Sequence, residues 1–265
     1  MELALAPLTL HRPHPLEAID AAAAAGYDLT GIQLALYGQP LSPLAHDPEF
    51  LSAARVALQR GGIAPLEVSN VVIDEEFRPE TARAIVDFAQ DVGARVVQAV
   101  CWDPVFDRAV EHLARTAEMA EGAGLLVAFE FMPYSATKTL VDAVELLGAT
   151  GRDNLRLLLD SLHFFRSGGV VSDLAAVDPG LFGVIQLSDA PLAPPADGQL
   201  RPESTGNRLV PGTGELPLRE LLGALPGGLP ISLEVPCRAI AELSLPEQAS
   251  FVLEGSRRFL EGAGL

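Results

Sequence analysis

The sequence predicts an α/β protein that forms a single (β/α)8 TIM barrel over residues 1–265. Short apolar runs typical of strands alternate with Ala-rich amphipathic segments along the whole chain, and each kind occurs eight times. Strict alternation implies parallel strands joined by right-handed crossovers. The length of 265 residues is close to the roughly 250 that eight such units need. An open, doubly wound sheet is the alternative.

Each expected strand is a run of five to eight mainly apolar residues, too short for a buried helix. In order, the strands are expected at residues 3–8, 29–36, 63–69, 95–100, 125–131, 155–159, 182–187 and 230–235. The acidic or amide residue near the end of several runs interrupts the apolar pattern. Such residues are therefore the first candidates for function.

The helices are expected where the apolar period changes to that of an amphipathic helix. They are placed at residues 15–25, 48–60, 79–92, 105–123, 137–150, 172–177, 217–225 and 246–262. Several begin with Pro and stop at Gly, as at Pro15 and Gly26, which is the usual asymmetry of helix ends. The longest connection, 189–215, is rich in Pro and Gly and follows the seventh strand, so we expect a lid over the site.

Composition restricts the kind of partner. The net charge is −17, from 35 acidic and 18 basic residues, and such a field repels nucleic acid and anionic membranes. No apolar run reaches about 18 residues, and no leader with a cleavage site is apparent, which predicts a soluble, cytoplasmic protein. Cys101 and Cys237 have no metal-ligand spacing and are expected to be core thiols.

Four polar residues stand at or near the ends of the last four strands: Glu130, Asp160, Gln186 and Glu234. In a barrel these ends meet on one face, where active sites lie. Buried charge there is costly unless something neutralises it, and a shared metal ion would do so. Oxygen ligands favour Mn²⁺ or Mg²⁺ over Zn²⁺. Taken singly, the glutamates could instead pair with Lys or Arg, Asp160 could cap a helix, and Gln186 could face water.

Further residues could complete the site. His163, three residues after Asp160, could orient a substrate hydroxyl or move a proton, and Arg208 in the long connection could grip a substrate oxygen. Trp102 could form a wall for a sugar ring. Glu67 and Gln33 could contact substrate or support its ligands. Ordinary packing or surface roles explain each of these five residues as well.

The motifs FEFMP, LLLDSLH, VIQLSDA, RLVPGTGELPL and ISLEVP resemble those of the xylose isomerase-like TIM barrels, across the whole chain. The resemblance implies a metal held by Glu130, Asp160, Gln186 and Glu234. Gln186 departs from the His of ketose 3-epimerases, whereas some 3-dehydroshikimate dehydratases carry Gln there. The endonuclease IV branch is a poor match, because this acidic chain has only five histidines.

The leading hypothesis is a metal-dependent isomerase or epimerase of a small sugar, sugar phosphate or polyol-derived carbonyl compound. Glu130 and Glu234 would act as base and acid, facing each other as the resemblance implies, while His163 and Arg208 hold substrate oxygens. A dehydratase-like lyase, with Arg208 or Lys138 binding a substrate carboxylate, is the second hypothesis. A barrel that binds sugar without catalysis is the third. The chain could act alone or as a homodimer.

Overall fold

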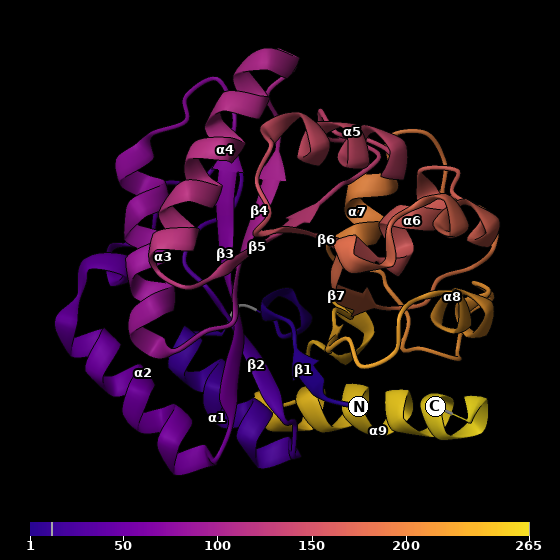
Figure 1. Cartoon of the computed structure of the whole chain (residues 1–265). Coiled ribbons are helices and arrows are strands. Elements are labelled where there is room, and N and C mark those ends of the chain that lie inside the picture. The colour runs from indigo at the N-terminus through magenta and orange to yellow at the C-terminus, as the bar shows by residue number, and fades with distance from the viewer. Residues whose placement is uncertain (12, 265) are drawn as a thin grey trace.

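The computed structural model describes residues 1–11 and 13–264 and has the predicted closed barrel. Eight strands follow one another in sequence order, neighbouring strands are parallel, and the first also pairs with the last (Figure 1). The strands are β1 Leu3–Leu5, β2 Leu29–Gln33, β3 Ala64–Ile73, β4 Val96–Cys101, β5 Leu126–Glu130, β6 Leu155–Asp160, β7 Phe182–Leu187 and β8 Ile231–Leu233. The predicted fold class is therefore confirmed.

Helices connect the strands and cover the barrel (Figure 1). They are α1 Pro15–Ala25, α2 Pro48–Gly61, α3 Pro79–Val92, α4 Phe106–Gly122, α5 Leu140–Thr150, α6 Ser161–Arg166, α7 Leu200–Ser204, α8 Leu218–Ala224 and α9 Leu245–Ala263. The last helix, α9, packs against α1 and so joins the two ends of the fold. Within the described residues, no helix is both long and apolar enough to cross a membrane.

Several predicted boundaries are wrong for identifiable reasons. The first strand ends at Leu5 because Pro7, which has no backbone N–H, begins a 3-10 turn over Pro7–Thr9. The expected helix at 172–177 is a 3-10 segment, Val171–Ala176. Two short helices, α6 and α7, were not expected, since five or six residues are too few to display a helical period.

The barrel interior consists of an apolar layer beneath a polar one. The apolar layer takes one residue from each of seven strands: Ala4, Leu29, Leu66, Val96, Ala128, Leu158 and Val184. Two residues further along a strand, the side chain points inward again. At that step β4 to β7 carry Gln98, Glu130, Asp160 and Gln186, all of them buried. The polar layer therefore lies at the carboxyl ends of the strands.

Candidate active site

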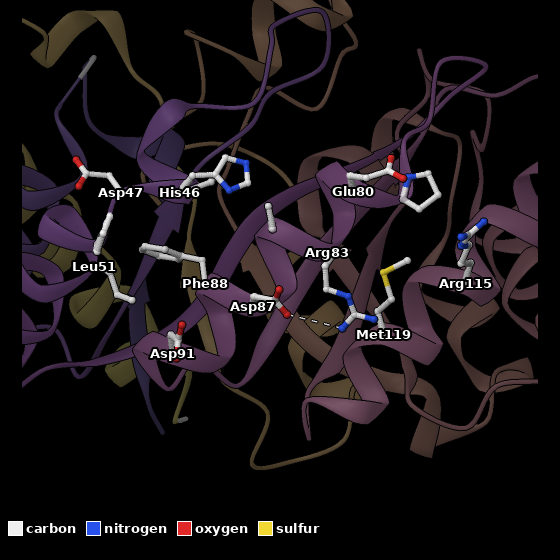
Figure 2. Close-up of a pocket in the computed structure, with 14 residues that line it drawn as sticks. His46, Asp47, Leu51, Glu80, Arg83, Asp87, Phe88, Asp91, Arg115 and Met119 are labelled. Carbon is white, nitrogen blue, oxygen red and sulfur yellow. Dashed lines mark ion pairs between the residues drawn. The ribbon is translucent and has the colours of Figure 1, made fainter.

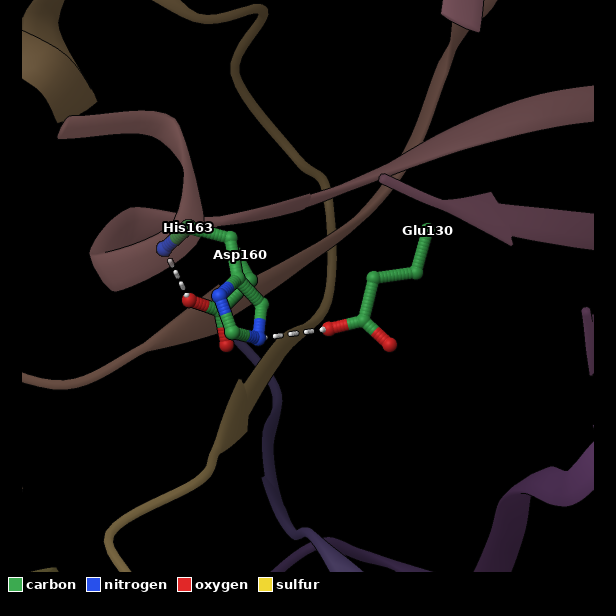
Figure 3. Close-up of side chains that lie close together, drawn as sticks. All are labelled: Glu130, Asp160 and His163. Atoms are coloured by element: carbon green, nitrogen blue, oxygen red, sulfur yellow. Dashed lines mark hydrogen bonds and ion pairs between the residues drawn. The ribbon is translucent and has the colours of Figure 1, made fainter. Parts of the chain in front are cut away.

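Three ligand-type side chains converge at the ends of β5 and β6. Glu130, Asp160 and His163 are buried and bring one ligand atom each to within 4.8 Å of one another (Figure 3). Asp160 also caps α6, since its carboxylate accepts the backbone N–H of His163 at 2.9 Å. The cap fixes His163, whose Nε2 lies 3.6 Å from Oε1 of Glu130. These three residues could hold a metal ion.

Arg208 enters this cluster from the long connection between β7 and β8. Its Nη1 lies 2.5 Å from Oδ2 of Asp160, and its Nη2 lies 2.7 Å from Oε2 of Glu234. Its Nε donates to the backbone carbonyl of Ser204 at 2.7 Å. The side chain is only 1% exposed, so one guanidinium bridges two buried carboxylates. Pairing with an Arg is the structural alternative that the sequence offered for Glu234.

The cluster remains strongly acidic despite Arg208. Burial, reinforced by the charges of Glu234 and Asp160, raises the pKa of Glu130 well above its usual value. Burial also raises the pKa of Glu234 to about 8. Burial alone would raise the pKa of Asp160 too, but the Arg208 charge outweighs it and holds that pKa low. Three carboxyl groups thus share one guanidinium, and a divalent cation would supply the positive charge that lets all three ionise.

His163 and Gln186 offer the neutral donors of the cluster. Burial lowers the pKa of His163 to about 4, so its imidazole is neutral at pH 7. Gln186 pairs in register with Asp160 and is fully buried, yet neither polar atom of its side chain has a hydrogen-bond partner within the described residues. Because an unpaired buried amide is costly, Gln186 also fits a bound metal or ligand.

A cavity of about 260 Å³ opens beside the cluster. Glu130, His163, Arg208 and Glu234 line it, and Trp102 and Gln33 lie along it as well. The ring of Trp102 stacks on Tyr37, with centroids 3.9 Å apart and planes 7° apart.

Four sequence candidates are not among the residues that line the cavity: Asp160 and Gln186, which belong to the cluster, and Glu67 and Lys138. Glu67 is fully buried and accepts a hydrogen bond from the hydroxyl of Ser232 at 3.0 Å. Burial raises its pKa to about 7. Lys138 is exposed. Neither residue is among those that line the cavity, so of the two cations that the sequence offered, Arg208 and Lys138, only Arg208 lies in the cavity lining.

Sequence reasoning missed two residues that contact the cluster. Gln98 donates from Nε2 to Oε2 of Glu130 at 2.8 Å. A polar residue inside the apolar run VVQAV was a usable signal, the same one that identified Glu130. Tyr134 shares a hydrogen bond of 2.6 Å with the hydroxyl of Ser204 and packs edge-on against His163. Its place in a loop gave no such signal.

The long connection is anchored by Asp189, which is 1% exposed. Its carboxylate accepts the backbone N–H groups of Ala190, Gly212, Gly214 and Leu216 at 2.8 to 3.1 Å. A Cβ on Gly214 would lie 2.4 Å from that carboxylate, which explains the glycine. The backbone of Asp189 also pairs with Leu209, the neighbour of Arg208. The expected lid is thus a folded segment over the site.

A second hollow, of about 550 Å³, lies outside the barrel against α2, α3 and α4 (Figure 2). Most of its charged side chains are exposed, and Arg83 pairs there with Asp87 at 3.7 Å. Solvated pairs of this kind contribute little. The buried, charge-bearing cavity at the strand ends is therefore the candidate active site.

The sequence matches a known protein family and several curated relatives. Residues 19–258 match the family described as xylose isomerase-like TIM barrel. An inosose isomerase of Halalkalibacterium halodurans is 30% identical over 149 residues, covering 55% of this chain and 51% of the relative. An inosose isomerase of Bacillus subtilis is 29% identical over 160 residues, covering 59% and 56%. The chain thus matches about half the length of these curated relatives.

Solved structures resemble the chain over nearly its full length. A structure of IOLI protein with a binding zinc atom has a TM-score of 0.84 and 21% identity, covering 99% of both chains. A D-psicose 3-epimerase of Clostridium cellulolyticum H10, with D-tagatose, has a TM-score of 0.75 and 14% identity, covering 98% and 99%. A probable 3-DHS dehydratase, AsbF of Bacillus anthracis, has 0.75 and 16%, covering 96% and 99%. At these identities the likeness establishes the fold.

Proposed function

Because this chain belongs to the xylose isomerase-like TIM barrel family, we propose that it is a divalent-metal-dependent isomerase or epimerase of a small polyhydroxylated ketone. One observation carries the proposal: two buried carboxyl groups of raised pKa, Glu130 and Glu234, line the same cavity. A carboxylate with a raised pKa is a stronger base near neutral pH, as proton abstraction beside a carbonyl requires. The names of the curated relatives support an inosose as the first substrate to test.

The chain's own residues account for the proton movements. Either Glu130 or Glu234 removes the proton from the carbon beside the carbonyl and becomes neutral. Return of a proton by the other glutamate to the opposite face inverts that carbon. Return of the proton to the former carbonyl carbon, with the hydroxyl proton passing between the two oxygens, moves the carbonyl instead. The Arg208 guanidinium, held by Asp160 and Glu234, places a fixed positive charge beside the substrate oxygen that becomes negative, and the neutral His163 imidazole orients a hydroxyl.

A divalent metal suits the donors present. Glu130, Asp160 and His163 would hold it, with Gln186 as a further donor beside Asp160. When bound, it would supply Lewis-acid stabilisation of negative charge on a substrate oxygen. The carboxylate and amide oxygens favour Mn²⁺ or Mg²⁺, whereas the His163 nitrogen also suits the Zn²⁺ that the IOLI structure contains. Titration of metal-free protein with each ion would rank them.

A lyase that dehydrates a 3-dehydroshikimate-like acid is the second candidate. Its substrate carboxylate needs a cation other than Arg208, which already bridges Asp160 and Glu234. Arg201 lines the cavity and lies over the ring of Trp102, 5.8 Å from its centroid, and could take that role. Both reactions begin with the same proton abstraction, so the products distinguish them.

The test is solvent exchange in D₂O. Metal-free protein would be supplied in turn with Mn²⁺, Mg²⁺ or Zn²⁺ and with an inosose, D-psicose or 3-dehydroshikimate. The proposal expects metal-dependent loss of one carbon-bound proton signal and formation of an isomer or epimer. Loss of water from 3-dehydroshikimate would favour the lyase instead. Ligand binding without exchange under any metal would favour a non-catalytic barrel.

A further inference from the structure

Three residues that line the cavity each have a buried polar atom with no partner. The Nε2 of Gln33, the Oδ1 of Asn70 and the Nε1 of Trp102 are buried, and none makes a hydrogen bond within residues 1–11 and 13–264. All three residues line the cavity, from β2, β3 and the position after β4. Because most buried polar atoms in proteins are paired, three unpaired ones around one cavity indicate a ligand.

On the reactive side of the same cavity, the charged groups have partners within the protein. There Glu130 is held by Gln98 at 2.8 Å, and Arg208 binds Asp160 and Glu234 at 2.5 and 2.7 Å. Among the residues that line the cavity, the unpaired buried atoms therefore belong to Gln33, Asn70 and Trp102 and not to the candidate base and acid, since Gln186 lies outside that lining. The part of a substrate that does not react would lie against these three residues.

The chemistry of this side suits hydroxyl groups. A side-chain amide offers a donor and an acceptor close together, and neighbouring hydroxyls each offer both as well. The last torsion of Gln33 and of Asn70 is roughly two-fold, so a flip of about 180° exchanges the two amide atoms. The stacked rings of Trp102 and Tyr37 add a flat apolar surface for the C–H groups of a ring.

We propose that Gln33, Asn70 and Trp102 form a polyol-recognition wall, which binds adjacent hydroxyls remote from the reacting carbon and selects cyclic polyols. This proposal rests on the proposed function for the identity of the reacting end. It makes Gln33 and Asn70 specificity-determining residues, and it gives the indole N–H of Trp102 a role beyond packing.

The test pairs nearly isosteric variants with a pair of substrates. Gln33→Met, Asn70→Leu and Trp102→Phe each remove the polar atom and keep most of the volume, and Met132→Leu is an apolar control in the same cavity. For an inosose we expect each of the three to lower kcat/KM by about tenfold, the effect of losing one good hydrogen bond. For the analogue that lacks the hydroxyl furthest from the carbonyl, we expect at least one variant to have the same kcat/KM as wild type. Equal losses on both substrates, or none, would overturn the wall.

A binding measurement separates this proposal from the catalytic one. myo-Inositol has no carbonyl, so its affinity, measured by calorimetry, does not depend on turnover. We expect binding to wild type and to Met132→Leu, and about tenfold weaker binding to Asn70→Leu. If exchange fails while this difference holds, the catalytic proposal falls and the wall stands. Undetectable binding of myo-inositol to wild type, or equal binding to Asn70→Leu, refutes the wall.

Thermal unfolding tests whether Gln33 and Asn70 stabilise the fold instead of binding substrate. Replacing unpaired buried polar groups with apolar ones should leave the stability of Gln33→Met and Asn70→Leu unchanged or higher, a common consequence of removing functional polar groups. A clear fall in their unfolding temperature would mean that these amides have partners within the protein, and it would overturn the wall.

Discussion

Arg208 donates from Nη1 to Oδ2 of Asp160 at 2.5 Å, and both side chains are buried. The contact ties the end of β6 to the connection that follows β7. A buried ion pair of this kind is not itself a large source of stability, but losing one partner leaves an uncompensated buried charge. The site should therefore be sensitive to charge removal at Arg208.

Replacing Arg208 with Met should destabilise the metal-free protein at pH 7 by about 3–5 kcal/mol, because the buried Asp160 carboxylate loses its cation. Urea unfolding measures this change. The control is Arg83→Met, which breaks an exposed pair with Asp87 and should cost no more than about 1 kcal/mol. Divalent metal should restore more stability to Arg208→Met than to wild type. If divalent metal stabilised both proteins equally, Arg208 would not be the group that neutralises the buried carboxylates.

Glu130→Gln and Glu234→Gln should each reduce exchange of the substrate proton by about 10²–10⁴-fold, the usual contribution of a positioned acid or base. Both variants keep the shape of the side chain, so their circular dichroism should match wild type. Glu111→Gln, on the exposed surface of α4, is the control and should exchange normally. Full activity in either site variant would remove that residue from the proton transfers.

Glu67 should make stability depend on pH. Its pKa is about 7 in the folded protein against 4.5 unfolded, because burial disfavours the carboxylate. The folded state thus binds more protons between these values, and stability falls as pH rises from about 4.5 to 7. Glu67→Gln removes this titration and should stabilise the metal-free protein at pH 8 by up to about 3 kcal/mol.

Urea unfolding of wild type and Glu67→Gln at several pH values from 5 to 8 checks this prediction. The difference between the two should grow with pH and level off above pH 7. Parallel curves would mean that Glu67 titrates normally. Glu111→Gln again serves as the exposed control.

Asp189→Asn should loosen the connection that carries Arg208. The variant replaces a carboxylate oxygen with an NH₂ group facing backbone donors, so we expect a loss of about 2–4 kcal/mol. Hydrogen exchange of the amides of residues 208–216 should become faster. Asp197→Asn, exposed on the same connection, should change neither quantity. Unchanged exchange in Asp189→Asn would show that the backbone alone fixes Arg208.

The repeating pattern was enough to predict the barrel. α1, α3 and β7 have the predicted limits, because Pro, Gly and apolar period agree there. Strand ends were less accurate where tertiary contacts decide them, as in β3, which continues to Ile73 against β4.

The candidate site was predictable only in part. Glu130 and Asp160 were found because a charge inside an apolar run is informative in sequence. The bridging position of Arg208 was not predictable, since it depends on a loop closed by Asp189, Gly212 and Gly214. Likewise, unpaired atoms such as Asn70 Oδ1 become visible only once every possible partner has been placed.

The polar side chains of the cavity and of the cluster beside it come from two halves of the barrel. Glu130, Asp160, Gln186 and Glu234 lie on or directly after β5 to β8, whereas Gln33, Asn70 and Trp102 lie on or directly after β2 to β4. Natural variation or laboratory selection can therefore alter the first half while the carboxylates of the second stay in place. A library confined to β2 through β4 is the direct route to changing which polyol the protein accepts.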